Sequence, residues 1–407
     1  MHDSRSEDRR PFHLAMLGTR GVPARYGGFE TAVERIGERL VARGHQVTVY
    51  ARNPGQRDRR YRGMRVVNLP AVRTRTTETL SHAVLSTAHT LLADRPDAVF
   101  VFNAANAPVI PVLRAAGLPV IVNVDGLESD RAKWRGLGSR YFAWAQAAAV
   151  RWADAVIADS RAIQVRIEAA YGRATHYISY GCDPATPDTD RLRAAGLSGG
   201  EYTLVVARFE PENHVDVIVR AYRAVPGQRP LVIVGDTPYS RDFRQRVHDL
   251  AEQDDRVRLL GTIYDQPWLS ALFAGARLHV HGHSVGGTNP SLLRAAVAAP
   301  VLAYDCPFNR EVLGDLAVGY WRGEDDLAAR LTTALAGERA APAGDRIAAR
   351  YCWDDVATAY LALAEGLITG RVAPAPGGVE PAAAPVAPRG VEPAAADPRT
   401  ADESRRP

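Results

Sequence analysis

The chain has 407 residues, of which 46% are hydrophobic and 24% charged, and its formal net charge at pH 7 is +4. This length and composition suit a globular protein of two ordinary domains. No run approaches the roughly 18 apolar residues needed to cross a bilayer, and the N-terminus lacks the apolar core and cleavage site of a signal peptide. We therefore expect a cytoplasmic protein.

The three cysteines, Cys182, Cys306 and Cys352, are widely spaced and form no C-x-x-C pair. This spacing argues against a disulfide framework or a zinc site and favours a reducing compartment.

The positive charge is concentrated near the start of the chain. Residues 1–80 carry sixteen arginines and eight acidic residues. This excess fits a solvated arginine-rich loop, or an anionic partner such as a phospholipid surface or a lipid-pyrophosphate acceptor. A nucleic-acid partner is disfavoured because the arginines are not interleaved with aromatic residues and no nucleic-acid-binding motif is present.

The first half of the chain alternates strands and helices. A buried strand is expected over 12–19, followed by a helix over 30–44 whose apolar residues share one face and whose C-cap is Gly44. Further strands are expected at 45–52, 64–70, 97–103, 119–126 and 154–160, and helices near 78–93, 107–115 and 138–153. This order predicts a parallel doubly wound sheet. The segment Tyr141–Trp152 is expected to be a helix packed within the domain rather than a helix on a membrane surface.

A second α/β series follows a Gly-, Pro- and Asp-rich stretch at 180–200. Strands are expected at 201–209, 229–236, 256–262 and 277–282, and helices at 215–225, 241–253 and 269–276. Two such domains in tandem place a site at the carboxyl ends of their strands, where the domains face each other. From about residue 371 the chain is dense in Pro and Ala and is expected to be disordered.

Two glycine-containing loops precede helices. "GTRGVPARYGGFE" lacks the G-x-G-x-x-G spacing, which disfavours a nicotinamide dehydrogenase. Its Gly27 and Gly28 either form a plain tight turn or let the backbone approach a phosphate at a helix N-terminus. In "HGHSVGGTNPSLLRAAV" a glycine pair, Gly286 and Gly287, leads into a helix, a pattern that presents backbone N–H groups to an anion.

Polar residues at strand ends are the other candidates. Arg208 is expected either to bind a diphosphate or to form a surface salt bridge. Asp125 is expected either to hold a sugar or acceptor hydroxyl or to form an Asp-Gly turn. His281 and His283 are too few for a zinc site, and one of them is expected to brace the adjoining loop.

These motifs together resemble one family. "GTRGVPARYGGFETAVERIGERLVARGHQVTVYAR", "DGLESDRAKW", "IADS", "ARFEPEN", "IVGD", "IYD", "HGHSVGGTNPSLL" and "DCPFNREVLGD" are similar to the retaining GT-B glycosyltransferases of the rhamnosyltransferase-like branch, which build cell-surface and capsular polysaccharides. The resemblance covers roughly residues 12–365, in the expected order.

The resemblance implies an α/β fold with two Rossmann-like domains facing across a cleft. The expected segments are a flexible N-terminus (1–11), an acceptor-side domain (12–184), a linker (185–200), a donor-binding domain (201–349), a helix crossing back to the first domain (350–370) and a disordered tail (371–407).

The same resemblance implies the roles of the site residues. Gly27 and Gly28 would approach the diphosphate and sugar of a nucleotide-sugar donor, Arg208 would neutralise the diphosphate, and Asp125 would lie near the reacting sugar. Asn213 stands where wider relatives carry a donor-binding lysine. The donor would also contact Gly286, Gly287, Thr288, Asn289, Pro290, Ser291 and Leu292.

The implied reaction is same-face attack by an acceptor hydroxyl, with the departing diphosphate oxygen accepting the proton. The scheme requires no metal and no cofactor. The acceptor would be a glycan, a lipid-linked intermediate or a small molecule, and a peripheral contact with the inner face of a membrane is compatible with it.

Arg294 departs from the family pattern, which has a glutamate there to accept hydrogen bonds from the donor ribose. An arginine has donors only. The change is compatible with an active enzyme whose ribose contacts differ, with an unusual donor, or with a catalytically silent GT-B protein that binds a nucleotide or a partner subunit. A GT-B epimerase matches the chain less well.

Overall fold

The computed structural model describes residues 10–24, 27–52, 59–72, 78–124, 137–237 and 240–371, without the side chains of 137–139. Asp125 and nearly all of the two predicted flexible ends, 1–11 and 371–407, therefore lie outside the described residues. Within the described part, no helix is both long and apolar enough to cross a membrane.

The first lobe is built on a sheet that has eight strands within the described residues, in the order β3-β4-β2-β1-β5-β6-β7-β8. The strands are β1 (His13–Leu17), β2 (Gln46–Ala51), β3 (Arg59–Tyr61), β4 (Met64–Asn68), β5 (Ala98–Phe102), β6 (Val120–Val124), β7 (Ala155–Ala158) and β8 (His176–Tyr177). The helical segments are α1 (Gly28–Ala42), α2 (Glu78–His89), the π-turn η1 (Thr90–Asp94), the 3-10 turn η2 (Ala104–Val109), α3 (Ile110–Ala115), α4 (Leu137–Trp152) and α5 (Arg161–Tyr171). Neighbouring strands run parallel except β3 and β4.

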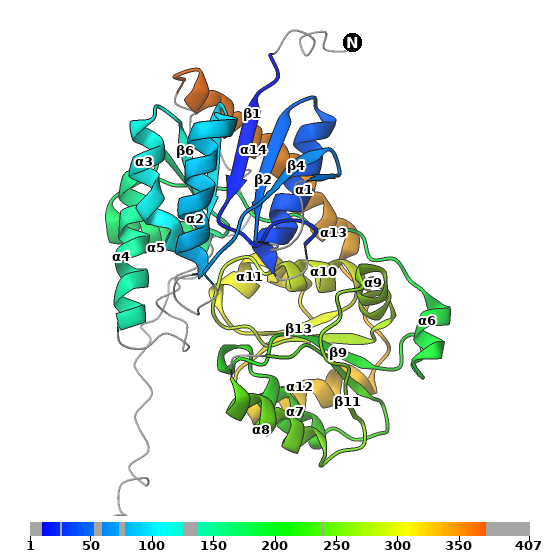
Figure 1. The fold of residues 1–407 in the computed structure, drawn as a ribbon. Helices are drawn as coiled ribbons and strands as arrows, with labels where there is room; N and C mark the ends of the chain where they lie inside the picture. Colours follow the sequence, from blue (N-terminus) through cyan, green and yellow to red (C-terminus); the bar gives the residue numbers. More distant parts are fainter. Residues whose placement is uncertain are drawn as a thin grey trace, which may run out of the picture. The chain divides into compact units, whose positions relative to one another are not determined.

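The second lobe has a parallel sheet with six strands among the described residues, ordered β11-β10-β9-β12-β13-β14. The strands are β9 (Thr203–Val206), β10 (Leu231–Val234), β11 (Val257–Leu259), β12 (Leu278–His281), β13 (Val301–Tyr304) and β14 (Gly319–Trp321). The helices of this lobe are α6 (Thr189–Ala194), η4 (Pro211–Asn213), α7 (Val215–Arg223), α8 (Arg241–Ala251), α9 (Gln266–Gly275), α10 (Pro290–Ala298), α11 (Pro307–Leu313), η5 (Gly314–Leu316), α12 (Glu324–Ala336) and α13 (Gly344–Arg350), and the last helix of the described chain is α14 (Trp353–Ile368). Figure 1 shows both sheets with their helices.

The predicted α/β fold with two Rossmann-like domains is confirmed. Central strands such as β5 and β6 are buried along their whole length, as expected of parallel strands covered by helices on both faces. On α1 the predicted apolar face is also present, because Val33, Ile36 and Leu40 are all buried.

The segment 185–200, the expected linker, contains α6, whose Asp188 side chain caps the helix and whose Leu192 is buried. One local expectation needs correction. The helix expected near 107–115 begins as the 3-10 turn η2, where Asn103 accepts a hydrogen bond from the Ala105 N–H and Pro108 cannot donate to an α-helical ladder.

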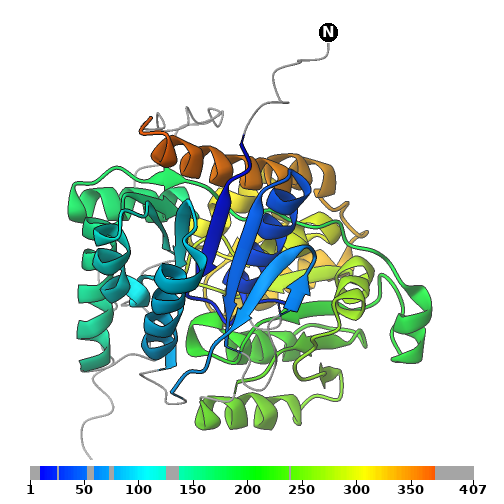
Figure 2. The ribbon, with the colours of Figure 1, turned by 45° about the horizontal axis from the view of Figure 1, so that its top comes forward.

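The last helix, α14, packs on the first lobe. Figures 1 and 2 show it, in orange, running beside α1. The Tyr360 ring lies 5.2 Å from the ring centroid of Phe100 and 6.5 Å from that of Phe102, and its hydroxyl pairs with the Asn123 amide. The chain therefore enters the second lobe after β8 and returns to the first lobe between α13 and α14.

Replacing Tyr360 with alanine tests this return. We expect Tyr360→Ala to lower the free energy of unfolding by about 3–5 kcal/mol, because a fully buried aromatic ring is lost and a cavity remains. Ala362→Ser, at an exposed position of the same helix, should change it by less than about 0.5 kcal/mol. Equal denaturation curves for the two variants would show that α14 is not part of the first lobe's core.

Candidate functional site

The loop after β1 is held against α1 by two carboxylates of that helix. The Glu30 Oε1 atom accepts a hydrogen bond from the Arg20 N–H at 3.0 Å, and Glu34 Oε2 accepts one from the Ala24 N–H at 2.7 Å. Gly18 has a φ of +100°, and a Cβ there would lie 2.2 Å from the Phe102 carbonyl oxygen. Glycine therefore lets this loop pass close over the end of β5.

The loop after β12 is fixed at both sides. Ser284 donates from its N–H and its hydroxyl to the Glu212 carbonyl, each at 3.0 Å. Asn289 caps α10 by accepting a hydrogen bond from the Ser291 N–H at 2.9 Å, and Pro290 occupies the first turn. The Ser291 hydroxyl donates to the Val206 carbonyl at the end of β9, at 3.2 Å.

The two glycine-containing loops meet at the junction of the lobes. A Cβ added to Gly28 would lie 3.1 Å from Pro290 Cγ, and one added to Gly287 would lie 2.0 Å from Asp159 Oδ1. The Thr288 hydroxyl donates to the Asp159 carbonyl at 2.5 Å. The N-termini of α1 and α10 thus lie together, and the dipole of a helix favours an anion at its N-terminus.

Arg208 lies two residues beyond β9 and is exposed. Among the described residues its guanidinium forms no ion pair. Its carbonyl accepts hydrogen bonds from the Glu210 N–H and the Asn213 side-chain amide, both at 2.8 Å. Asn213 itself is 2% exposed, so its amide holds the backbone at Arg208, and its predicted direct contact with a ligand stays a prediction.

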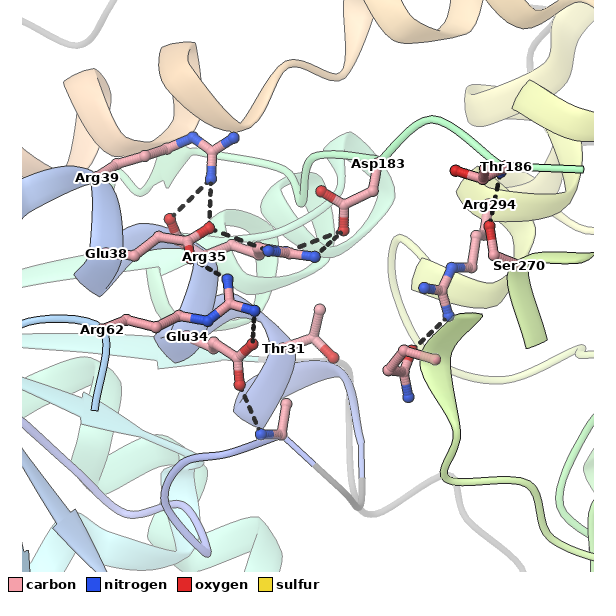
Figure 3. A network of polar contacts seen from close by, with 12 residues as sticks. Thr31, Glu34, Arg35, Glu38, Arg39, Arg62, Asp183, Thr186, Ser270 and Arg294 are labelled. Atoms are coloured by element: carbon pink, nitrogen blue, oxygen red, sulfur yellow. Dashed lines mark hydrogen bonds and ion pairs between the residues drawn. The ribbon is translucent and has the colours of Figure 1, made fainter. Parts of the chain in front are cut away.

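Arg294 extends from α10 toward α9, where its Nη1 donates to Gln266 Oε1 at 2.8 Å. Figure 3 shows Arg35 of α1 and Asp183 in the same region, where the Arg35 guanidinium pairs with the Asp183 carboxylate at 2.9 Å. Burial lowers the pKa of Arg294, with Asp183 raising it and Arg35 lowering it. The arginine remains charged at neutral pH.

The histidines of β12 and the following loop have structural positions. His281 is fully buried and stacks on His283, with ring centroids 4.4 Å apart. Burial, with smaller effects of His283 and His279, holds the pKa of His281 well below 6.5, so it is neutral. His214 also contacts this loop, with its Nδ1 2.8 Å from the Gly282 carbonyl.

Among the described residues, no group of three or more His, Cys, Asp or Glu side chains is arranged to bind a metal ion. Metal independence stays a prediction. The Leu292 side chain is fully buried, so its contact with a donor stays a prediction for its backbone. The structure places Gly28 against Pro290 at the start of α10, whereas Arg294 is directed toward α9.

Three carboxylates at the junction were not singled out in the sequence. Asp159 supports the loop of Gly287, and Asp183 faces Arg294. Glu311 of α11 lies at the N-terminus of α5. It accepts hydrogen bonds there from the Arg161 N–H at 2.8 Å and the Ala162 N–H at 3.3 Å. Glu311 belongs to the motif "DCPFNREVLGD" and Asp159 to "IADS". The motifs therefore identified the segments that contain these carboxylates, but not the residues that the carboxylates contact.

The close approach at Gly287 can be tested by one added methyl group. We expect Gly287→Ala to lower the free energy of unfolding by about 1–3 kcal/mol, because the Cβ would overlap the Asp159 carboxylate and force the loop away. Thermal unfolding measures the effect. Gly199→Ala is the matched control, since nothing lies within 4 Å of its Cβ position. Indistinguishable midpoints for the two variants would contradict the interlobe packing described above.

Comparisons with known proteins agree with this architecture. The family model of the glycosyl transferase 4-like domain matches residues 27–181, and the model of glycosyl transferases group 1 matches residues 189–346. No curated protein matches the chain.

Several solved structures share the fold. Anabaena Alr3699/HepE in complex with UDP-glucose is 18% identical, with a TM-score of 0.70 over 88% of this chain and 100% of that one. WaaG, a glycosyltransferase involved in lipopolysaccharide biosynthesis, is 18% identical, with a TM-score of 0.62 over 90% and 100%. AviGT4, a glycosyltransferase involved in avilamycin A biosynthesis, is 20% identical, with a TM-score of 0.58 over 88% and 99%.

At these identities the solved structures establish the fold, and the two family models, which together span most of the chain, identify its domains. The chain belongs to the GT-B glycosyltransferases, with a glycosyl transferase 4-like domain followed by a group 1 domain.

Proposed function

We propose that this glycosyltransferase moves a hexose or deoxyhexose, with rhamnose among the candidates, from a nucleoside diphosphate to a hydroxyl of a glycan, lipid-linked or small-molecule acceptor, with retention of configuration. The observation that carries the proposal is the meeting of two helix N-termini, from opposite lobes, at Gly28 and Pro290. Backbone N–H groups and the positive ends of two helix dipoles there favour a diphosphate.

The donor's diphosphate would lie at the N-terminus of α10. Residues 287–292 would offer N–H groups, except Pro290, which has none, and Ser291, whose N–H is donated to Asn289, and Arg208 would contribute a permanent positive charge. Gly27 and Gly28 would let the backbone at the start of α1 approach the diphosphate and the sugar. Alr3699/HepE has been crystallised with UDP and with UDP-glucose, which makes UDP-hexoses the first donors to examine.

In the proposed mechanism the acceptor hydroxyl attacks the anomeric carbon on the face from which the diphosphate departs. The departing oxygen takes the proton, and the protein stabilises its negative charge through Arg208 and the α10 N–H groups. These groups supply positive charge without a metal. Asp125 is proposed to contact the reacting sugar or the acceptor.

Arg208 is the sharpest test of this mechanism. We expect Arg208→Ala to lower kcat by at least about 100-fold, because a charge that stabilises the leaving group is lost. Transfer or donor hydrolysis, followed by mass spectrometry over a panel of nucleotide sugars, measures the effect. Arg208→Lys should recover part of the rate, since a lysine restores the charge without the bidentate geometry.

Arg193→Ala serves as the control, because Arg193 is an exposed arginine whose one ion pair among the described residues is with Asp190, at 2.9 Å. Near-normal turnover by Arg208→Ala protein with an unchanged melting temperature would refute the role of Arg208.

The second candidate function, a catalytically silent protein that binds a nucleotide or a partner subunit, is favoured by Arg294 alone. Its guanidinium is directed to Gln266 and lies in the field of Asp183. A ribose diol bound beside it would meet hydrogen-bond donors and not a carboxylate acceptor. Nucleotide binding without transfer or hydrolysis of any donor would support this candidate.

Arg294→Glu separates the interpretations of this position. If an accepting carboxylate suits the donor ribose, nucleoside-diphosphate affinity measured by calorimetry should stay the same or rise by up to about tenfold, which is 1.4 kcal/mol. Arg294→Gln, which removes the charge, is the matched control. A loss of more than about tenfold in both variants would show that the arginine itself holds the donor.

A further inference from the structure

The two chain segments that connect the lobes lie against each other. One leads from β8 to α6 and contains Cys182, and the other leads from α13 to α14 and contains Cys352. These two cysteines pair in a parallel β-bridge, in which the Cys182 N–H donates to the Tyr351 carbonyl at 2.8 Å. The Cys182 thiol points to the same carbonyl, with its Sγ 3.3 Å from the oxygen.

We propose that Cys182 and Cys352 are a redox-active pair that a small-molecule disulfide converts to a reversible disulfide bond, which ties the two interlobe connections together. Paired residues of adjacent strands lie about 4.8 Å apart, within the roughly 4.4–6.8 Å between Cα atoms that a disulfide spans. Both cysteines are partly exposed and both are reduced in this structure.

Cys306 provides an internal contrast. It is 7% exposed and its Sγ contacts the His283 carbonyl at 3.7 Å, far along the chain from either connection. Neither its burial nor its position suits exchange with a small disulfide. The structure therefore selects one pair among the three cysteines.

The chemistry is thiol–disulfide exchange and needs a disulfide such as oxidised glutathione as the oxidant. The Cys352 thiolate attacks one sulfur of the small disulfide, which forms a mixed disulfide and expels one small-molecule thiolate. The Cys182 thiolate then attacks the Cys352 sulfur, which forms the Cys182–Cys352 bond and expels the second small-molecule thiolate. The protein loses two hydrogens, and the small disulfide becomes two thiols. Burial, helped by Asp183 and Cys352, raises the pKa of Cys182 to about 11, so the exchange is slow and is measured at equilibrium.

A disulfide bond between Cys182 and Cys352 would lie beside residues that pack against the N-terminus of α1, where the donor site is proposed. Tyr180, two residues before Cys182, lies 3.7 Å from the Cβ position of Gly28, and Gly181 packs against the Trp353 ring. Asp183, the next residue, pairs with Arg35 of α1. We expect the bond to restrict the N-terminus of α1 and, on the proposed function, to slow the turnover that depends on it.

The bond itself is tested without any substrate. Cys306→Ser protein, which retains only the proposed pair, is equilibrated in glutathione buffers of increasing oxidised fraction, quenched with a maleimide and weighed. We expect both thiols to disappear together, with the loss of two hydrogens and full recovery in dithiothreitol. Separate glutathione adducts on the two cysteines, or two thiols that persist in fully oxidised buffer, would overturn the proposal.

The consequence is tested on the same samples. Amide hydrogen exchange in the second turn of α1, whose N–H groups are hydrogen-bonded within the helix, should slow by about tenfold on oxidation, and turnover of a donor should fall by a similar factor. Cys352→Ser protein should show neither response to the oxidant. Unchanged exchange in fully oxidised Cys306→Ser protein would refute the restriction. An absence of turnover in the reduced protein would instead count against the proposed function.

Discussion

The contact between Gly28 and Pro290 sets the geometry of the junction. Two helices from different lobes begin within van der Waals distance of each other, and a side chain at Gly28 would press on the Pro290 ring. On the other side of the same loop, Gly287 leaves room for the Asp159 carboxylate. Because these glycines have no side chain, the two lobes can approach closely here, and backbone N–H groups of both lobes come to one place.

The charges around this contact are arranged unequally. Arg208 is exposed and its backbone is held by the buried Asn213 amide, so a permanent cation is presented at the end of β9 without an ion pair among the described residues. Arg294 of α10 instead donates a hydrogen bond to Gln266 and lies near the ion pair of Asp183 with Arg35. One arginine is available to an anionic ligand, and the other stands among protein partners.

The sequence was informative where local patterns decide the structure. The apolar strands, the apolar face of α1 and the helix-starting sequence Thr-Asn-Pro-Ser can each be recognised from neighbouring residues. Together they predicted the two Rossmann-like domains correctly. Their order also predicted that strand ends from both domains would face each other. The roles of the site residues toward a donor stay predictions, and Asp125 lies outside the described residues.

What the sequence did not reveal depends on partners far apart in the chain. Asp159 matters because Gly287 packs on it, 128 positions later, and Asp183 because it pairs with Arg35 of α1. Propensity and periodicity contain no information on such pairs. The direction of Arg294 is of the same kind, since only the packing of α9 beside α10 brings Gln266 within reach. The pairing of Cys182 with Cys352 likewise requires the return of the chain at α14.

The central claim is that both lobes bind one pyrophosphate-linked sugar at the junction of α1 and α10. A crystal structure of the protein soaked with a nucleoside diphosphate tests it most directly. The account predicts phosphate oxygens within hydrogen-bond distance of backbone N–H groups among Gly287, Thr288, Asn289 and Leu292 and of the Arg208 guanidinium. A nucleotide bound elsewhere, or bound here with Arg208 turned away from the phosphates, would contradict it.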